Sequence, residues 1–412
     1  MVSVPALLPA KVPFVPAPDQ LAAAAGNVAH KLLYGGIADL RPMPRQLIDD
    51  GMLRELYHYR PLPDVPQLDD PVLLVMPLAA PSRCYDLRRG CSLVEHLVQQ
   101  GRPTYLVEYG EISFANRNLG MEHWIETVVP AAVREVSEHA GGRAVHVVAW
   151  SLGGTFALLS AAAFPDLPIA SMTIFGTPID ISQVPLIAPL RPLVDLTDGK
   201  IVGTAVHLLG GAPKPLVRWA FQLSAVQKMV TKPYAQLIHL ADSDFLAQLE
   251  AVDRFTEGII AYPGRTFGQL YHRFVRRNEL VDGTFELADR TLDLADIEVP
   301  VLVFGGATDG IAPVPSVRVL TDLLRGSAEV RFHVVPGGHL GMLTGRAART
   351  TSWPMLDSWI EQHASSRRTA EKPATKSASG RAIGANPRRR YSSQSSRDLA
   401  RPPRRAVSGT PE

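Results

Sequence analysis

The sequence is poor in cysteine, in aromatic residues and in long apolar runs, and each shortage excludes a class of protein. Only two cysteines, Cys84 and Cys91, occur in 412 residues, whereas secreted scaffolds held together by disulfides carry many more. Their spacing fits neither a zinc-ligand pair nor a Cys-x-x-Cys redox motif. No other cluster of metal-ligating residues stands out, so we expect two reduced thiols and no metal site.

Segments that direct a chain into or across a membrane are also missing. No apolar run reaches the roughly 18 residues that a membrane-spanning helix needs. The N-terminal stretch MVSVPALLPAKVPFVPAPDQ has no basic region leading into an unbroken apolar segment, and its prolines break any helix. We therefore expect no signal peptide. The sequence also lacks a P-loop and a glycine-rich dinucleotide motif after a strand, which argues against a nucleotide cofactor.

Charge is distributed unevenly along the chain. The formal net charge is +2, yet the segment from Ser365 to Glu412 holds twelve Lys and Arg against three Asp and Glu. This segment has almost no large apolar residues, so we expect a disordered basic tail over residues 367–412. Such a tail could bind an anionic lipid or granule surface, or nucleic acid in a salt-dependent way. Most such tails are simply solvated, and we expect no specific nucleic-acid partner.

The body of the chain alternates between strand-like and helix-like segments. The first series predicts strands at 71–78, 103–109, 144–150 and 170–176, with helices at 91–101, 121–139 and 153–164. The second series predicts strands at 299–306 and 328–338, with helices at 314–326 and 353–363. Apolar strands alternating with amphipathic helices predict a mostly parallel sheet flanked by helices. Pro130 inside the second helix predicts a kink or a boundary there.

A block rich in Leu, Ile and Pro separates the two series. We interpret residues 178–294 as a largely helical cap inserted into an α/β core. The predicted organisation is an N-terminal extension (1–70) that ends in a short strand or ribbon, then core (71–177), cap (178–294), core (295–366) and tail (367–412).

The stretch HVVAWSLGGTFALL, residues 146–159, predicts a strand, a sharp turn and a helix with Ser151 at the turn. This arrangement is the nucleophile elbow of the α/β-hydrolase fold, usually written G-x-S-x-G. Here Ala149 replaces the first glycine. The N–H of Leu152 opens the following helix, so it is our first candidate for stabilising an oxyanion. A second donor should come from the loop after the first core strand, at Leu78 or Ala79.

Two residues further along the chain complete this pattern. α/β-Hydrolases carry their catalytic residues in the order Ser, Asp or Glu, His. Asp309 follows one predicted strand and His339 follows the next, so we expect His339 to accept the Ser151 proton and Asp309 to orient His339. If Asp309 only formed a turn, the order Ser151, Asp309, His339 along the chain would be a coincidence. His146 and His333 lie within apolar strands and are predicted to be core histidines.

With these residues in view, the chain resembles the poly(3-hydroxyalkanoate) synthases, especially the shorter class that works with a partner subunit. The resemblance spans about residues 50–363. It rests on LYHYRPLP before the first strand, on PSRCYDLRRGCSLVEHLVQQGRPTYLVEYGE, and most specifically on the long segment 262–313. It implies an α/β-hydrolase fold, with Asp309 and His339 as catalytic residues and Ser151 at the nucleophile position. Synthases carry cysteine there, and commonly a histidine where this chain has Gly310.

The serine leaves three functions open. An oxygen ester on serine is less activated than a thioester and is more typical of hydrolases. The first function is a serine acyl hydrolase or acyltransferase that acts on lipid esters, polyesters or acyl-CoA thioesters. The second is a synthase that polymerises hydroxyacyl-CoA. The third is a non-catalytic protein associated with granules or lipid droplets.

The three functions lead to the same expectations about cofactors, location and partners. We expect no cofactor, with CoA entering only as part of an acyl-CoA substrate. The expected location is the cytoplasm, with the basic tail available to contact granules or the inner membrane surface. The oligomeric state is left open, a homo-oligomer included.

Overall fold

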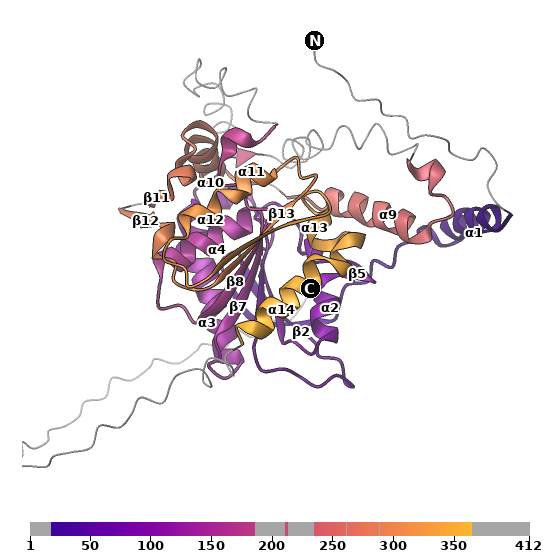
Figure 1. Cartoon of the computed structure of the whole chain (residues 1–412), viewed down its shortest axis with the longest axis horizontal. Coiled ribbons are helices and arrows are strands. Elements are labelled where there is room, and N and C mark those ends of the chain that lie inside the picture. The colour runs from indigo at the N-terminus through magenta and orange to yellow at the C-terminus, as the bar shows by residue number, and fades with distance from the viewer. Residues whose placement is uncertain (1–17, 186–210, 213–234, 261, 288, 365–412) are drawn as a thin grey trace, which may run out of the picture. The chain divides into compact units, whose positions relative to one another are not determined.

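The computed structural model describes residues 18–185, 211–212, 235–260, 262–287 and 289–364. Within them, an eight-stranded sheet has the order β1-β2-β6-β3-β7-β8-β13-β14 (Figure 1). Its strands are Arg45–Gly51 (β1), Arg54–Tyr59 (β2), Val72–Val75 (β3), Thr104–Glu108 (β6), Val145–Trp150 (β7), Ile169–Phe175 (β8), Val301–Gly306 (β13) and Val330–Val335 (β14).

The sheet is mostly parallel, as the sequence predicts. Strands β6, β3, β7, β8, β13 and β14 pair in parallel, while β2 pairs antiparallel with both β1 and β6. Every residue of β3, β7 and β8 is buried, which explains why these strands read as continuous apolar runs. The predicted ribbon before residue 71 is the β1–β2 pair, and it forms one edge of the sheet.

Helices cover both faces of the sheet. The longer helices described are Pro18–Tyr34 (α1), Leu93–Gln99 (α2), Val129–His139 (α3), Leu152–Ala163 (α4), Ser243–Glu257 (α9) and Ser352–Gln362 (α14). Helix α1 has no buried residue and lies away from the sheet (Figure 1). Helices α3 and α4 lie on one face, and α2 and α14 lie on the other (Figure 1). A hydrogen bond of 2.7 Å between His96 Nε2 and Asp357 Oδ2 joins α2 to α14.

Two predicted helices are interrupted. Residues 121–139 form a π-helical segment, His123–Val128 (η3), followed by α3 with Pro130 in its first turn. A proline has no N–H to donate and is tolerated there, so it marks a boundary between the two segments. The helix expected over 314–326 is likewise divided, into Val314–Arg318 (α11) and Leu320–Leu323 (α12).

The two strand histidines differ in their environment. His146 on the central strand β7 is 1% exposed, and its Nδ1 lies 2.8 Å from Ser171 Oγ. His333 is only partly buried, so the prediction of a core histidine is wrong at this position. The reason is that β14 is an edge strand, with one neighbour and incomplete cover.

Part of the predicted cap and the whole predicted tail lie outside the described residues. The described part of 178–294 contains α9, Gly264–Gln269 (α10), a π-helical segment Leu270–Arg276 (η6) and a hairpin of Thr284–Leu287 (β11) with Arg290–Asp293 (β12). Shorter elements are Asp86–Arg88 (β4), Cys91–Ser92 (β5), Gly211–Ala212 (β9), Tyr262–Pro263 (β10) and Gly341–Thr344 (α13).

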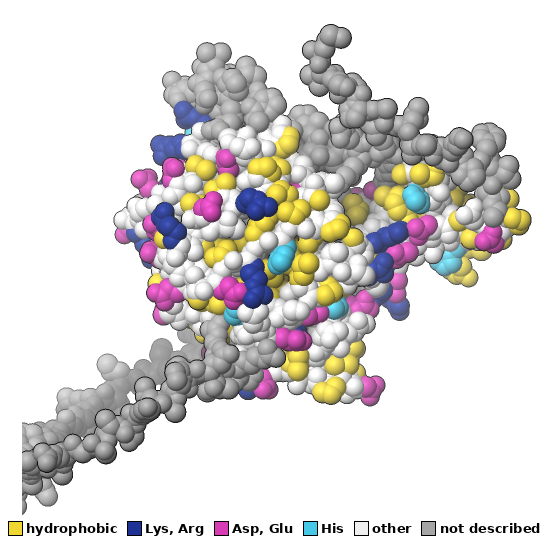
Figure 2. Space-filling model, in the orientation of Figure 1, with side chains coloured by type: hydrophobic (Ala, Val, Ile, Leu, Met, Phe, Trp, Pro, Cys, Tyr) yellow, Lys and Arg dark blue, Asp and Glu magenta, His cyan; other side chains and the backbone are white. Residues whose placement is uncertain are grey.

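One face of the described surface carries side chains of several kinds (Figure 2). On the face shown in Figure 2, acidic and basic side chains are interspersed among apolar ones. Among the helices described, none is long and apolar enough to cross a membrane.

Candidate active site

Ser151 occupies a strained turn between β7 and α4. Its φ and ψ angles are 54° and −128°, a backbone conformation that L-residues rarely adopt and that recurs at functional sites. The turn is fastened to the neighbouring strand, because the Ser151 N–H donates to Phe175 O at 2.8 Å and Thr177 Oγ1 donates to Ser151 O at 2.8 Å. Ser151 itself is only partly buried.

Gly153 allows this turn to pack against the end of β3. A Cβ at this position would lie 2.5 Å from Val75 O and 2.7 Å from Met76 O, and neither backbone oxygen can move easily. The downstream glycine of the elbow pattern is therefore required by sterics. The upstream position is less restrictive, and Ala149 fits there fully buried.

Three side chains from separate loops meet at this turn. Ser151 Oγ lies 2.9 Å from His339 Nε2, and His339 Nδ1 lies 2.8 Å from Asp309 Oδ2. Asp309 follows β13, and His339 follows β14. Because β7, β13 and β14 are parallel, their carboxyl ends lie at the same end of the sheet. Asp309 is 6% exposed and His339 is 9% exposed, so water has little access to the pair.

Backbone amides hold the Asp309 carboxylate in place. Its Oδ1 accepts hydrogen bonds from the N–H groups of Ile311 at 2.8 Å and Ala312 at 2.9 Å. Its Oδ2 is thereby directed at His339 Nδ1. With a proton on Nδ1, His339 Nε2 would accept from the Ser151 hydroxyl, which is the geometry expected of a serine nucleophile.

The candidate oxyanion donors come from two segments, the start of α4 and the loop after β3. Leu152 begins α4, so its N–H belongs to the first turn, where amides have no partner within the helix. Leu78 and Ala79 lie in the loop after β3 and are buried. Tyr109 OH donates to Met76 O at 2.8 Å, and Ile260 N–H donates to Ala79 O at 2.9 Å, so both ends of this loop are held. Stabilisation of an oxyanion by these amides stays a prediction.

Neither cysteine offers an alternative nucleophile. Both thiols are free and buried. Burial raises the pKa of Cys84 and of Cys91, which keeps both thiols protonated and unreactive.

Trp150 is a neighbour of the site that the sequence reasoning missed. Its Nε1 donates to His339 O at 3.0 Å, and its ring centroid lies 4.9 Å from that of His339. In the elbow pattern this position is a variable x, so the pattern alone assigns it no role. The only available signal was a large aromatic residue directly before the serine.

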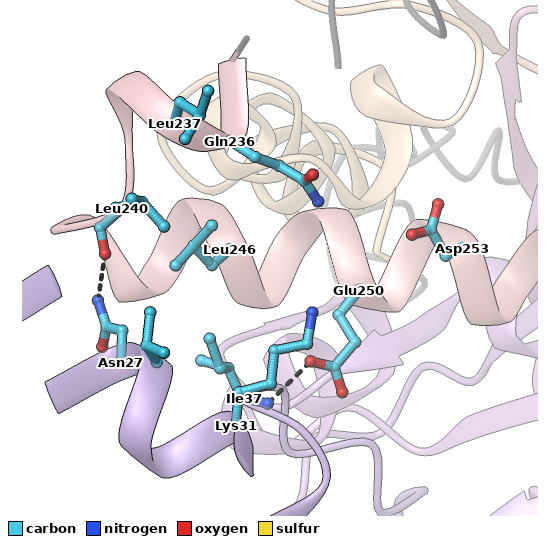
Figure 3. A pocket seen from close by; sticks show the side chains of 10 residues that line it. Asn27, Lys31, Ile37, Gln236, Leu237, Leu240, Leu246, Glu250 and Asp253 are labelled. Atoms are coloured by element: carbon cyan, nitrogen blue, oxygen red, sulfur yellow. Dashed lines mark hydrogen bonds between the residues drawn. The ribbon is translucent and has the colours of Figure 1, made fainter. Parts of the chain in front are cut away.

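A separate cavity of about 410 Å³ lies between α1 and α9 (Figure 3). Asn27 Nδ2 donates to Leu240 O at 2.8 Å, and Ile37 N–H donates to Glu250 Oε2 at 2.8 Å, which fastens α1 and its following loop to the cap side. None of the residues predicted for the site lines this cavity. The described residues also contain no cluster of His, Cys, Asp and Glu suited to a metal ion.

Comparison with known proteins identifies the family of the chain. The alpha/beta hydrolase fold family matches residues 112–346, more than half of the chain. The chain belongs to this family. Among solved structures, the proline iminopeptidase of Mycobacterium smegmatis covers 78% of this alpha/beta hydrolase at 17% identity, with a TM-score of 0.43, and 98% of its own chain is matched.

Curated relatives narrow the similarity within the family. The poly(3-hydroxyalkanoate) polymerase subunit PhaC of Allochromatium vinosum is 24% identical over 340 residues, which is 82% of this chain and 94% of the relative. PhaC of Synechocystis sp. is 24% identical over 311 residues, covering 74% and 81% of the two chains. The resemblance to poly(3-hydroxyalkanoate) synthases that the sequence motifs predict is confirmed.

Proposed function

We propose that this alpha/beta hydrolase is a serine-dependent acyl hydrolase or acyltransferase that works through a covalent acyl-enzyme. One observation carries the proposal, namely the hydrogen-bonded series from Ser151 Oγ through His339 to Asp309. The similarity to polymerase subunits supports acyl transfer as the reaction class.

The first half of the reaction acylates the serine. Ser151 Oγ attacks the acyl carbonyl carbon while His339 Nε2 takes the hydroxyl proton. Negative charge moves to the carbonyl oxygen, where the amide of Leu152 and one amide of the 78–79 loop donate hydrogen bonds. The tetrahedral intermediate then collapses, and the leaving alcohol or CoA thiol receives the proton from His339. Asp309 remains ionised and stabilises the imidazolium that forms in between.

The second half removes the acyl group. His339 takes a proton from an incoming nucleophile, which attacks the ester on Ser151, and the proton then returns to Ser151 Oγ. Water as the nucleophile yields a free acid, whereas a hydroxyl group of an acceptor yields a new ester. The choice between hydrolysis and transfer therefore depends on which nucleophile reaches the acyl-enzyme.

Apolar side chains beside the site suit an acyl chain. Phe255 near the end of α9 packs against Trp150, with ring centroids 6.1 Å apart. Ile259, just beyond α9, is in contact with Ala79. Both residues are buried and apolar, so the surroundings of the site are more compatible with a hydrocarbon chain than with a charged group. This favours esters or thioesters of fatty or hydroxy acids.

A second candidate is polyester synthesis, which the similarity to PhaC polymerase subunits over most of the chain favours. The serine argues for hydrolysis or a single transfer, because an oxygen ester is a weaker acyl donor than the thioester that a cysteine would carry.

Two measurements test the proposal. A fluorophosphonate probe should label Ser151 in the wild type, and mass spectrometry should locate the adduct. Absence of labelling would favour the non-catalytic alternative. Product analysis with 3-hydroxybutyryl-CoA and with a medium-chain p-nitrophenyl ester then separates the two enzymatic functions. Free acid or a single transfer product supports the first, and high-molecular-weight polyester supports the second.

A further inference from the structure

Trp150 touches His339 in two ways. Its indole N–H donates to the His339 carbonyl oxygen at 3.0 Å, and the two rings lie 4.9 Å apart at an interplanar angle of 41°. Trp150 is 2% exposed. A buried N–H of this kind needs its partner, because leaving it unsatisfied costs about 1–3 kcal/mol. The contact therefore constrains both residues.

The loop that carries His339 is held on both sides of that residue by backbone hydrogen bonds, from Thr308 N–H to Gly337 O at 3.0 Å and from Met342 N–H to Gly338 O at 3.0 Å. It runs from Pro336 through two glycines, and Gly341 follows shortly after His339. Glycine-rich backbone has more conformational freedom than any other. The hydrogen bond to the His339 carbonyl and the ring against its imidazole act at His339 itself, in addition to the backbone bonds on either side of it.

The other side of Trp150 faces the cap. Phe255 of α9 is 5% exposed and packs on the indole. Helix α9 is in turn held by an ion-pair cluster at its N-terminal end, where Asp244 lies 2.6 Å from Arg88 and 2.9 Å from Arg349. Trp150 is thus fixed between a cap helix and His339.

We propose that Trp150 is a positioning residue that holds His339 in line with Ser151, acting through the His339 carbonyl and ring. The proposal rests on the catalytic role of Ser151 and His339. It assigns a function to Trp150, the residue before Ser151, whose contacts with His339 are to its carbonyl and its ring.

Trp150→Phe is the direct test, because it keeps an aromatic ring and removes the N–H. We expect kcat to fall about tenfold, with KM within about twofold, as for the loss of one hydrogen bond that acts on the transition state. The rate of fluorophosphonate labelling should fall in parallel. A kcat within about twofold of the wild type would overturn the proposal.

The chain offers a matched control in Trp353. Its Nε1 donates to Leu343 O at 2.8 Å, its ring lies 4.9 Å from that of His96, and it is 5% exposed. Trp353→Phe therefore removes an equivalent bond from an equivalent environment. Both variants should lower Tm to a similar extent, but only Trp150→Phe should slow turnover. Equal loss of kcat in both variants would mean that the effect is one of general stability, and the proposal would be wrong.

Two further measurements cover other outcomes. Should Trp150→Phe fail to fold, site-specific replacement of Trp150 by 3-benzothienylalanine keeps the shape of the indole and replaces the N–H by sulfur. Proton NMR reports the Nδ1–H that His339 shares with Asp309 without any substrate. We expect this resonance to broaden when Trp150 is changed and to persist in Trp353→Phe. An unchanged resonance in both variants contradicts the positioning role even if the wild type proves to have no acyl turnover.

Discussion

His339 Nε2 lies 2.9 Å from Ser151 Oγ, although the two residues are 188 positions apart in the sequence. The same imidazole lies 2.8 Å from Asp309 through its other nitrogen. These two distances connect three loops that share no local sequence. They place an imidazole nitrogen beside the serine hydroxyl and a carboxyl group on the far side of that imidazole.

Removal of any member of this series should abolish most turnover. Ser151→Ala and His339→Ala should each lower kcat by roughly 10³-fold or more, and Asp309→Asn should lose most activity by stabilising the wrong imidazole tautomer. Ester turnover and circular dichroism should be measured together. Ser358→Ala, which changes an exposed serine on α14, is the control and should be fully active. Near-normal turnover by Ser151→Ala would rule out the assignment.

Ser151→Cys should change which substrates react. The thiol would stand beside His339 and the start of α4, both of which favour the thiolate. Because thiolate is a better leaving group than an alkoxide, the intermediate formed from an oxygen ester should collapse back to the substrate. We expect loss of ester hydrolysis and retention of exchange with acyl-CoA, measured by CoA release. Undiminished hydrolysis of p-nitrophenyl esters and alkyl esters alike would contradict this expectation.

Gly153→Ala should destabilise the fold at the elbow. The added methyl would meet Val75 O at 2.5 Å, and overpacking of this kind costs about 1–3 kcal/mol. Urea denaturation measures the free energy of unfolding. Gly268→Ala is the matched control, since a Cβ there meets nothing within 4 Å and helix α10 should tolerate alanine or gain stability. Equal stability of the two variants would show that the elbow adapts.

The attachment of α9 should weaken in acid. Burial alone would raise the pKa of Asp244, but the hydrogen bond and charge of Arg88 and the nearby Arg349 lower it overall from its usual 3.8. A lowered pKa in the folded state stabilises the protein above pH 3.8, and this stability is lost as the pH falls through the folded pKa. The free energy of unfolding should therefore fall less steeply below pH 4 in Asp244→Asn. Parallel acid limbs for the two proteins would exclude this contribution.

The basic segment beyond the core should be unnecessary for chemistry. Its composition predicts disorder, and it begins after the last core helix. Truncation after His363 should leave turnover of a soluble ester unchanged. Binding to vesicles of anionic lipid at low salt should weaken, because the truncation removes twelve Lys and Arg residues. Added salt should reduce the binding of the full chain in the same direction, because it screens these charges. Failure of the truncated protein to fold would show that the segment has a structural role.

The sequence by itself determined the fold class and the identity of the candidate site residues. Buried parallel strands read as unbroken apolar runs, so β3, β7, β8 and β13 were visible as a pattern. Small residues around Ser151 marked a tight turn, since the end of β3 approaches it closely. Asp309 and His339 each follow such a strand, and parallel strands bring their carboxyl ends together. These inferences depend on local composition and order along the chain, which the sequence contains. The catalytic roles of the three residues stay predictions.

Only the tertiary structure decided the contacts that reach across the fold. The exposure of His333 depends on whether its strand has one neighbour or two, which strand composition does not reveal. The bonds from Trp150 to the His339 carbonyl and from Tyr109 to the Met76 carbonyl end on backbone oxygens. Every residue has such an oxygen, so these partners leave no signature in the sequence. The attachment of α9 through Asp244 depends on arginines from two distant segments of the chain. Such ion pairs form only when the fold brings the segments together, so the spacing of residues in the sequence does not reveal them.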